Sequence, residues 1–459
     1  MSEMTLPTPS ELRNQVPEAM NVADTLHKAG FKAYFAGGSV RDMLLDRPFK
    51  DVDIATSAGP DQVEDLFPHT HAIGKAFGVI QVVEGEEVFE VATFRQDLAY
   101  QDGRRPEGYK PSTPELDASR RDFTINGLFL DPQSGELIDY VNGKLDLAAG
   151  VVKAIGDPDL RFREDHLRLL RAVRFASVLE FEIEAHTWKA IQSKAPLIEH
   201  ISVERIQSEV VRLLTESPKA GDGLERLRQS GLLRYILPEI LLCIGCEQPP
   251  EYHPEGDVWT HTVLMLNELT NPSVDLALSV LLHDSGKPAT RTEEAGRIRF
   301  QGHAQVGAEI ASEWMMRMKF SKALRENVVG LVYRHMDMMN VPHMRKGTLR
   351  KIVARECFED EVELHRIDCL CSNGITASTE RLLEARVDFL KDAALPKPWI
   401  TGKELLEMGI SPGPEMGSWK QRAYDQQLEG EQENADALKL WLLNNLQAES
   451  GDPSKGNPS

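Results

Sequence analysis

Two adjacent glycines, Gly37 and Gly38, open the segment GGSVRD, and the motif DVD follows it with Asp51 and Asp53. Paired glycines let the backbone approach a bound group closely, and Arg41 within the segment can neutralise a phosphate. In the β-rich run DVDIAT, side chains two residues apart point to one face of a strand, so both carboxylates can hold one pair of divalent cations. Asp-x-Asp alone is usually a solvated turn. Combined with the glycine segment, it predicts a two-metal site for displacement at a phosphate.

The pattern of apolar residues changes near residue 150. Before this point, an amphipathic helix-like segment at 20–30 leads into the strand-like KAYFAGG, and VIQVVEG and VFEVATF are β-rich runs separated by Gly and acidic turns. From residue 160, apolar residues recur at spacings of three and four in EDHLRLLRAVRFASVLEF, HTWKAIQSKAPLI, ERIQSEVVRLL and GLERLRQSGLLRYI. The pattern predicts an α+β chain with a small α/β head and an all-α remainder.

The charge balance restricts how the chain can contact nucleic acid. Among 459 residues, 72 Asp and Glu face 52 Lys and Arg, which gives a net charge of −20. Domains that bind nucleic acid are usually basic, so any RNA contact must be local. The stretch 151–250 is near neutral and contains an arginine cluster from Arg161 to Arg174. We expect a polyanion to bind there, and to bind more weakly as the salt concentration rises.

The composition gives no sign of a membrane or secreted protein. No uninterrupted apolar run approaches the length of a membrane span, and the polar start MSEMTLPTPSE lacks a secretory signal pattern. Five cysteines are too few and too irregularly spaced for a disulfide framework, and Cys243-x-x-Cys246 lacks the second pair typical of a zinc site. We therefore expect a cytoplasmic protein without membrane contact, whose cysteines are ordinary thiols.

A second motif, RRDFTIN, contains Arg121 directly before a strand-like run. Adjacent arginines often form only surface ion pairs, but a buried neighbouring backbone would hold Arg121 rigidly, and a rigid guanidinium suits a triphosphate. The preceding loop with Asp102, Arg104 and Arg105 is either a solvated loop or a lid over the nucleotide, and the sequence leaves the two about even.

A third motif lies in Glu164–Arg174. Helical spacing predicts Asp165 beside Arg168, and Arg171 and Arg174 follow on neighbouring turns. Such a pair is often only a surface salt bridge. It has a specific functional interpretation as well, because cytosine and adenine each present an amino donor beside a ring-nitrogen acceptor. A carboxylate beside a guanidinium matches both bases and mismatches guanine and uracil, a discrimination that can reach ~10⁴. The pair would thus select C and A without a nucleic-acid template.

A fourth constellation occupies the C-terminal half of the chain. Adjacent His and Asp follow an apolar run, and further His and Asp residues lie on separate predicted helices. A lone His on an apolar helix is usually a packed core residue, whereas this combination has the ligand chemistry of a divalent-metal site. The candidate ligands are His261, His283, Asp284 and Asp368, with His303 and His335 as further candidates.

The first three motifs resemble those of class II CCA-adding tRNA nucleotidyltransferases, a family of the polymerase-β-like superfamily that also contains bacterial poly(A) polymerases. The resemblance covers roughly residues 20–240, and the family's helical motif after the template appears as Glu204-Arg205-Ile206. It implies that Asp51 and Asp53 are catalytic and hold Mg²⁺. It also implies a nucleotide site made of Gly37, Gly38, Arg41, Arg121, Asp165, Arg168, Arg171 and Arg174. The chain departs from the family at Asp46, where Gly is common, and at Gly127, where Ala is usual.

The fourth constellation resembles an HD-domain phosphohydrolase over about residues 250–375. This resemblance implies an unidentified divalent metal and hydrolysis of a 2′,3′-cyclic phosphate or a phosphomonoester. Together the resemblances imply an α+β fold with a small polymerase-β-like α/β catalytic head, followed by an elongated all-α neck, body and HD domain. The expected parts are the head at 1–150, a helical neck and body for nucleotide selection and RNA binding at 151–249, the HD domain at 250–375, and a helical tail with a disordered C-terminus at 376–459.

The function implied is template-independent addition of CCA to tRNA 3′ ends from CTP and ATP. A poly(A) polymerase, or a partial enzyme that adds only CC or only A, would keep the same fold. An alternative from another class is an HD phosphohydrolase whose head only binds RNA or nucleotide. Intact Asp51 and Asp53 argue against that alternative and against a non-enzymatic RNA-binding scaffold.

Overall fold

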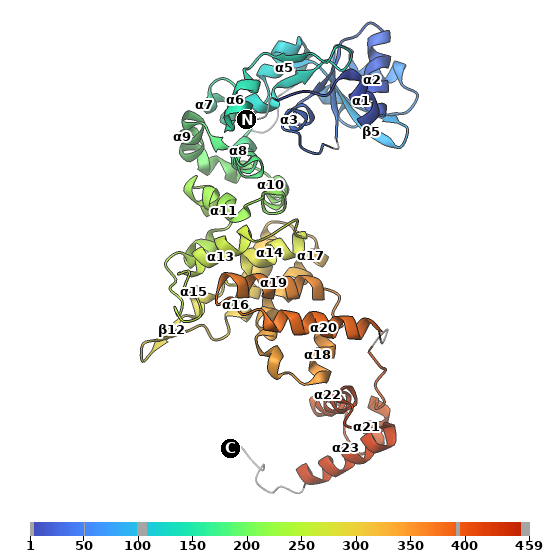
Figure 1. Cartoon of the computed structure of the whole chain (residues 1–459), viewed down its shortest axis with the longest axis vertical. Coiled ribbons are helices and arrows are strands. Elements are labelled where there is room, and N and C mark those ends of the chain that lie inside the picture. The colour runs from blue at the N-terminus through green and yellow to red at the C-terminus, as the bar shows by residue number, and fades with distance from the viewer. Residues whose placement is uncertain (1–3, 50, 99–107, 392–394, 451–459) are drawn as a thin grey trace. The chain divides into compact units, whose positions relative to one another are not determined.

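The computed structural model describes residues 4–49, 51–98, 108–391 and 395–450. The chain forms two compact units (Figure 1). The first contains Met1–Leu242, Leu266–Val274 and Trp314–Phe320, and the second contains Cys243–Met265, Asp275–Glu313 and Ser321–Ser459. The four-part division expected from the sequence stays a prediction, and the C-terminal end expected to be disordered, 451–459, lies outside the described residues.

A seven-stranded sheet, counted over the described residues, forms the centre of the head. Its order is β3 (Thr70–His71), β4 (Val79–Glu84), β5 (Glu87–Thr93), β2 (Asp53–Thr56), β1 (Ala33–Ala36), β8 (Leu128–Leu130) and β9 (Leu137–Asp139). Strands β2 and β5 run parallel with Ile54 opposite Val91, and the other pairs are antiparallel. This register puts Asp53 and Glu90, the preceding residues, side by side.

Helices surround this sheet and continue beyond it in the first unit. Helices α2 and α4 contact the strands, and a buried cluster that includes Phe94 and Phe129 anchors the sheet to α5. The helices are α1 (Pro9–Gln15), α2 (Pro17–Lys28), α3 (Gly38–Leu44), α4 (Pro60–Leu66), α5 (Pro114–Ser119), α6 (Gly143–Ala149), α7 (Pro158–Glu164), α8 (Leu167–Leu179), α9 (Ala185–Lys194), α10 (Val203–Glu216), α11 (Ala220–Gln229) and α12 (Leu233–Ile236). Short strand pairs join β6 (Arg95–Asp97) to β7 (Tyr109–Pro111) and β10 (Val151–Val152) to β11 (Glu182–Ile183).

The predicted α+β class is confirmed, but one predicted helix is wrong at its start. The sequence predicted a helix running through Asp165, whereas α7 ends at Glu164 and Asp165 is extended, with φ −138° and ψ 107°. The carboxylate of Asp165 accepts a hydrogen bond from the backbone N–H of Leu167 at 3.1 Å. Acidic side chains often end one helix and begin another in this way, because they bond to nearby backbone groups. The run FTIN, predicted as strand, is a 3₁₀ turn before β8.

Two departures from the family pattern have local structural reasons. Asp46 has a φ of 52°, a left-handed conformation that Gly adopts at lower cost. At Gly127, a Cβ would lie 2.7 Å from Cγ2 of Val141, so Ala would require a neighbouring side chain to move. Both positions are turns that leave the sheet and its site residues in place.

The second unit is largely helical. The helices after residue 250 are α13 (Val258–Asn267), α14 (Val274–Leu282), α15 (Lys287–Thr290), α16 (His303–Arg317), α17 (Lys322–Arg334), α18 (Lys346–Val353), α19 (Phe358–Cys371), α20 (Ala377–Lys391), α21 (Gly402–Glu407), α22 (Pro414–Glu429) and α23 (Ala435–Ser450). One hairpin joins β12 (Thr292–Glu294) to β13 (Arg297–Arg299). Across the described residues, no helix has both the length and the apolar character needed to cross a membrane.

Candidate active site

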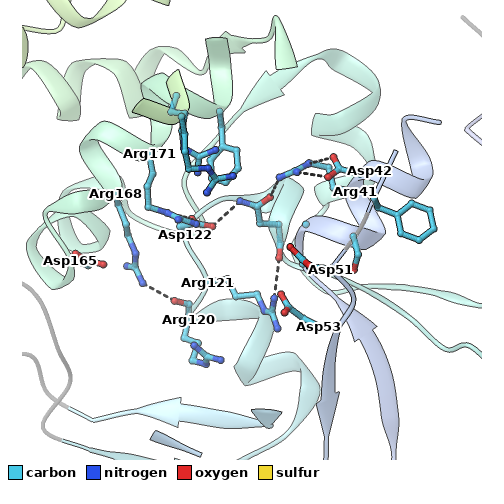
Figure 2. Close-up of a pocket in the computed structure, with 18 of the residues that line it drawn as sticks. Arg41, Asp42, Asp51, Asp53, Arg120, Arg121, Asp122, Asp165, Arg168 and Arg171 are labelled. Atoms are coloured by element: carbon cyan, nitrogen blue, oxygen red, sulfur yellow. Dashed lines mark hydrogen bonds and ion pairs between the residues drawn. The ribbon is translucent and has the colours of Figure 1, made fainter. Parts of the chain in front are cut away.

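Asp51 and Asp53 border a cavity of about 570 Å³ in the first unit (Figure 2). Asp53 is the first residue of β2 and Asp51 directly precedes the strand. Close to Asp53, Gly37 has a φ of 73°, and a Cβ there would lie 3.0 Å from Nη1 of Arg121. A glycine is therefore required both by the backbone conformation and by the close approach of the guanidinium.

Three carboxylates converge at the start of β2. Burial, together with the neighbouring charges of Glu90 and Asp51, raises the pKa of Asp53 to about 6, despite the opposing effect of Arg121. Glu90, on β5, borders an adjoining cavity together with both aspartates. A cation offsets the repulsion between neighbouring carboxylates, and carboxylate oxygens are ligands that divalent metals prefer. The chemistry of these donors therefore suits a divalent metal ion.

We call this cavity the arginine pocket. Each arginine that lines it is paired with an acidic side chain. Figure 2 shows Arg41 beside Asp42 and Arg171 beside Asp122. The pairs are Arg41 with Asp42 at 2.9 Å, Arg120 with Asp117 at 2.7 Å, Arg121 with Asp117 at 3.0 Å, Arg168 with Glu164 at 2.8 Å, Arg171 with Asp122 at 2.6 Å, Arg174 with Glu209 at 2.5 Å, and Arg212 with Glu216 at 2.7 Å. Burial alone would raise the pKa of Asp122, but Arg171 and Asn126 hold it at about 2. The guanidinium groups are thus fixed in position by the protein itself.

Three of these guanidinium groups surround one aromatic ring. The centre of the Phe175 ring lies 4.0 Å from the guanidinium carbon of Arg174, 5.1 Å from that of Arg171 and 5.2 Å from that of Arg41. Phe175 lines the arginine pocket on α8. The π face attracts each cation and so offsets part of their mutual repulsion.

The residues expected to read the base, Asp165 and Arg168, both line the arginine pocket, and they pair with other residues and not with each other. Asp165 forms a two-pronged ion pair with Arg205, at 2.9 and 3.2 Å. Arg168 instead donates to Glu164 and to the backbone carbonyl of Arg120, at 2.8 and 2.9 Å. The helix break at Asp165 is the physical reason, because it turns the carboxylate toward α10. The loop with Asp102, Arg104 and Arg105 lies outside the described residues.

In the second unit, six predicted ligands come together, which we call the histidine cluster: His261, His283, Asp284, His303, His335 and Asp368. Ligand atoms lie within 4.8 Å of one another in two groups, His261 with His283 and Asp368, and Asp284 with His303 and His335. The ring nitrogen Nε2 of His283 lies 3.2 Å from Asp284, which joins the groups.

Backbone carbonyls set the orientation of three rings in the histidine cluster. Nδ1 of His283, His303 and His335 lies 2.9, 2.8 and 2.6 Å from the carbonyl oxygen three residues earlier in each case. A carbonyl only accepts hydrogen bonds, so each Nδ1 carries the proton and each Nε2 presents a lone pair. Imidazoles held in this way are ready to bind a metal through Nε2.

The two facing rings of His303 and His335 indicate that the histidine cluster fits a cation. Their Nε2 atoms are 3.1 Å apart. Burial lowers the pKa of His335 to about 4 and also lowers the pKa of His303, so both rings are neutral at pH 7. Two lone pairs at this distance repel each other unless a cation lies between or beside them. Asp284, 3.6 and 3.8 Å from the two nitrogens, supplies negative charge for such a cation.

Comparison with known proteins gives a consistent result for three parts of the chain. Residues 33–153 match the family model of the poly A polymerase head domain, 180–243 that of the probable RNA and SrmB-binding site of polymerase A, and 257–368 that of the HD domain. A CCA-adding enzyme of Geobacillus thermodenitrificans is 44% identical over 220 residues, 48% of this chain and 54% of the relative. The chain spans about half the length of this and similar relatives.

Another relative aligns over nearly its whole length. The CCA-adding enzyme of Levilactobacillus brevis is 32% identical over 403 residues, which are 87% of this chain and 90% of the relative. The chain belongs to the family of CCA-adding enzymes. The crystal structure of the Bacillus stearothermophilus CCA-adding enzyme in complex with CTP has a TM-score of 0.73 and 25% identity, over 95% of this chain and 98% of the other. A head of this family implies a divalent-metal requirement.

The structure brings together all the site residues named for the head from the sequence, in or beside one cavity. It also adds two that sequence reasoning missed. Nothing in the sequence singles out Glu90, since VFEVATF alternates as any half-exposed strand does. Arg205 was named only as part of a helical motif, and its contact with Asp165 spans 40 positions of the chain. The roles of all these residues stay predictions.

Proposed function

We propose that this protein adds CCA to the 3′ end of tRNA, using CTP and ATP and no nucleic-acid template. One observation supports this most strongly: the carboxylates Asp51 and Asp53 face the arginine pocket across a single cavity. Relatives named as CCA-adding enzymes favour this function over poly(A) addition and over partial CC or A addition. Localisation in the cytoplasm remains a prediction from the sequence.

In this proposal, the protein's side chains have separate tasks. Arg41 and Arg121 would bind the triphosphate, and Asp165 with Arg168 would read the pairing edge of the base. The ion pair between Asp165 and Arg205 would hold the carboxylate toward the base site. Because a fixed carboxylate and guanidinium mismatch guanine and uracil, selection would not need a template strand.

Asp51 and Asp53 would hold Mg²⁺, with Glu90 next to them. Divalent cations at such a site neutralise charge on the attacking and leaving oxygens of an in-line displacement. Mg²⁺ prefers carboxylate oxygens and substrate phosphates to imidazole or thiolate ligands, which matches the groups at the start of β2. The carboxylates must be ionised to bind it, and burial raises the pKa of Asp53 to about 6.

The decisive test uses three tRNA substrates that end before the CCA, after the first C and after the second C. Each is incubated with purified protein, Mg²⁺ and single nucleotides or mixtures, and products are sequenced. We expect CTP alone to add two residues, ATP alone to extend only the substrate ending in CC, and UTP and GTP to add none. Long A tracts would show a poly(A) polymerase, and failure at one step would show a partial enzyme.

The histidine cluster supports a second proposed function, metal-dependent hydrolysis of a phosphate ester. The specific observation is that both ring nitrogens of His261 and Nε2 of His283 are buried without a hydrogen bond of good geometry. Such groups are costly in a protein interior unless a ligand satisfies them. An N/O donor set of this kind suits a first-row transition metal such as Mn²⁺, Co²⁺ or Ni²⁺.

The second function is tested with model substrates. Wild-type protein is incubated with 2′,3′-cyclic phosphates and phosphomonoesters in the presence of Mg²⁺, Mn²⁺, Ni²⁺ or Co²⁺, and phosphate or ring opening is measured. We expect hydrolysis with at least one transition metal and its loss in the presence of a chelator. Absence of hydrolysis with every metal would contradict this proposal and leave the first one untouched.

A further inference from the structure

His261 differs from the other rings of the histidine cluster in how its two nitrogens are placed. The ring is fully buried, and no backbone carbonyl lies at its Nδ1, unlike the rings at 283, 303 and 335. Instead, its Nδ1 lies 2.7 Å from Oε1 of Glu255, and its Nε2 lies 3.1 Å from Oδ1 of Asp368, both at hydrogen-bonding distance but without ideal hydrogen-bond geometry. The ring thus sits between two carboxylates, one at each nitrogen.

Glu255 itself is placed to act on this ring. Its side chain is only 7% exposed, and it lies in the segment just before α13, the helix that carries His261. The same oxygen also accepts from Nδ1 of His253 at 2.9 Å. Two imidazole nitrogens therefore meet one carboxylate oxygen, which holds Glu255 in place from both sides.

The three rings held by carbonyls all present Nε2 to the cluster, and a fourth ring can join them only with the same tautomer. A neutral imidazole has one N–H and one lone pair, so Nε2 of His261 is free for a metal only if Nδ1 carries the proton. A buried N–H needs an acceptor, and Glu255 is the group at that distance. A carboxylate in this position also increases the basicity of the ring and so strengthens its bond to a metal.

We infer that Glu255 is a positioning residue of the histidine cluster: it fixes His261 as the Nδ1–H tautomer, with Nε2 directed at a divalent cation shared with His283 and Asp368. This inference rests on the proposed metal centre. It assigns Glu255 no direct bond to the cation. In the other possible arrangement, His253, Glu255 and His261 form a metal site of their own, since their ligand atoms also lie within 4.8 Å of one another. It would use Nδ1 of His261 and exclude Glu255 from the orienting role.

Metal titration of the full-length protein separates these arrangements. Binding of Co²⁺ is followed by calorimetry and by its visible absorption, first for wild type and then for Glu255→Ala, Glu255→Gln and His253→Ala. We expect Glu255→Ala to weaken Co²⁺ affinity by roughly 10- to 100-fold. Glu255→Gln keeps an acceptor oxygen at Nδ1 and should recover most of the affinity, with an absorption spectrum close to that of wild type. His253→Ala should weaken the affinity much less than Glu255→Ala does, since it removes no ligand and leaves Glu255 in contact with His261.

Each of the other possible titration results contradicts one specific part of the inference or of the proposed metal centre. If wild type binds Co²⁺ and Glu255→Ala binds it equally, the positioning role is wrong and the metal centre stands. If Gln and Ala at 255 and Ala at 253 all weaken binding alike and change the spectrum, Glu255 is a ligand and the inference fails. If wild type binds none of Co²⁺, Mn²⁺ and Ni²⁺, the metal centre itself is wrong. Circular dichroism without metal identifies any variant that fails to fold, and the Gln variant then carries the test.

Discussion

The arginine pocket and the histidine cluster differ in how their polar groups are satisfied. In the arginine pocket, the guanidinium groups have acidic partners within the protein, such as Asp122 for Arg171 and Glu209 for Arg174. In the histidine cluster, buried nitrogens of His261 and His283 have no hydrogen bond of good geometry. The arginine pocket therefore offers its remaining donors to an anion. In the histidine cluster, Lys287 pairs with Asp284 at 2.7 Å, and the unsatisfied ring nitrogens favour a cation as the ligand.

This difference has an energetic meaning. Charges that are paired in advance cost little to hold in place, so the binding of a triphosphate requires little reorganisation. Unpaired buried groups are costly until a cation arrives, so metal binding should stabilise the second unit. The following predictions test the contrast, from the largest effect to the smallest.

Asp51→Ala or Asp53→Ala should reduce nucleotide addition with Mg²⁺ by roughly 10³-fold or more, because metal positioning supplies several kcal/mol in phosphoryl transfer. Single-turnover extension of tRNA lacking CCA measures the loss. The control is Glu86→Gln, which removes an exposed acid at the tip of the same sheet. Near-normal rates in a folded aspartate variant would show that these carboxylates do not hold the metal.

His283→Ala combined with Asp284→Ala should abolish metal-dependent phosphate-ester hydrolysis and leave nucleotide addition within about twofold, since independent sites act additively. The two sites share no residue and belong to different compact units. Both activities are assayed in one preparation. A matching loss of tRNA extension would mean that the histidine cluster supports tRNA binding and is not a separate active site.

Asp165→Ala should lower the preference for CTP and ATP over UTP and GTP by at least about tenfold, because one polar contact contributes 1–2 kcal/mol to discrimination. The ratio of kcat/KM values for the four nucleotides measures it. Glu180→Gln, an exposed acid at the end of α8, is the control. Unchanged selectivity in the Asp165 variant would exclude the carboxylate as a base-reading group.

Asp122→Asn should destabilise the first unit by about 2 kcal/mol at pH 7, since Arg171 and Asn126 lower the pKa of Asp122 from 3.8 to about 2 despite its burial. A lowered acid pKa stabilises the fold above the unfolded-state value, and the effect disappears as pH falls through the folded value. The difference in unfolding free energy between variant and wild type should therefore be about half as large at pH 3 as at pH 7. Urea unfolding at both pH values checks this, and a pH-independent difference would contradict the ion-pair explanation.

Local sequence patterns predicted the elements and site residues of the head well. They could not predict contacts between residues far apart in the sequence. Asp51, Asp53 and Arg41 could be placed from spacing alone, because strand and turn geometry acts over a few residues. The pairing of Asp165 with Arg205 depends on how α7, α8 and α10 pack, which no local pattern encodes. The members of the histidine cluster could be proposed from their ligand chemistry and from the resemblance to HD domains, but not their mutual geometry. Its ring tautomers depend on carbonyl positions that only the structure supplies.

Phe175 has no charge and makes no hydrogen bond through its side chain, yet three guanidinium groups face its ring. The ring occupies volume that water would otherwise fill, so it lowers the local dielectric constant around Arg41, Arg171 and Arg174 together. One neutral side chain thereby adjusts how strongly three cations attract an incoming nucleotide. Replacement of this single aromatic residue is consequently a route to changing the strength of triphosphate attraction while every charge in the pocket remains.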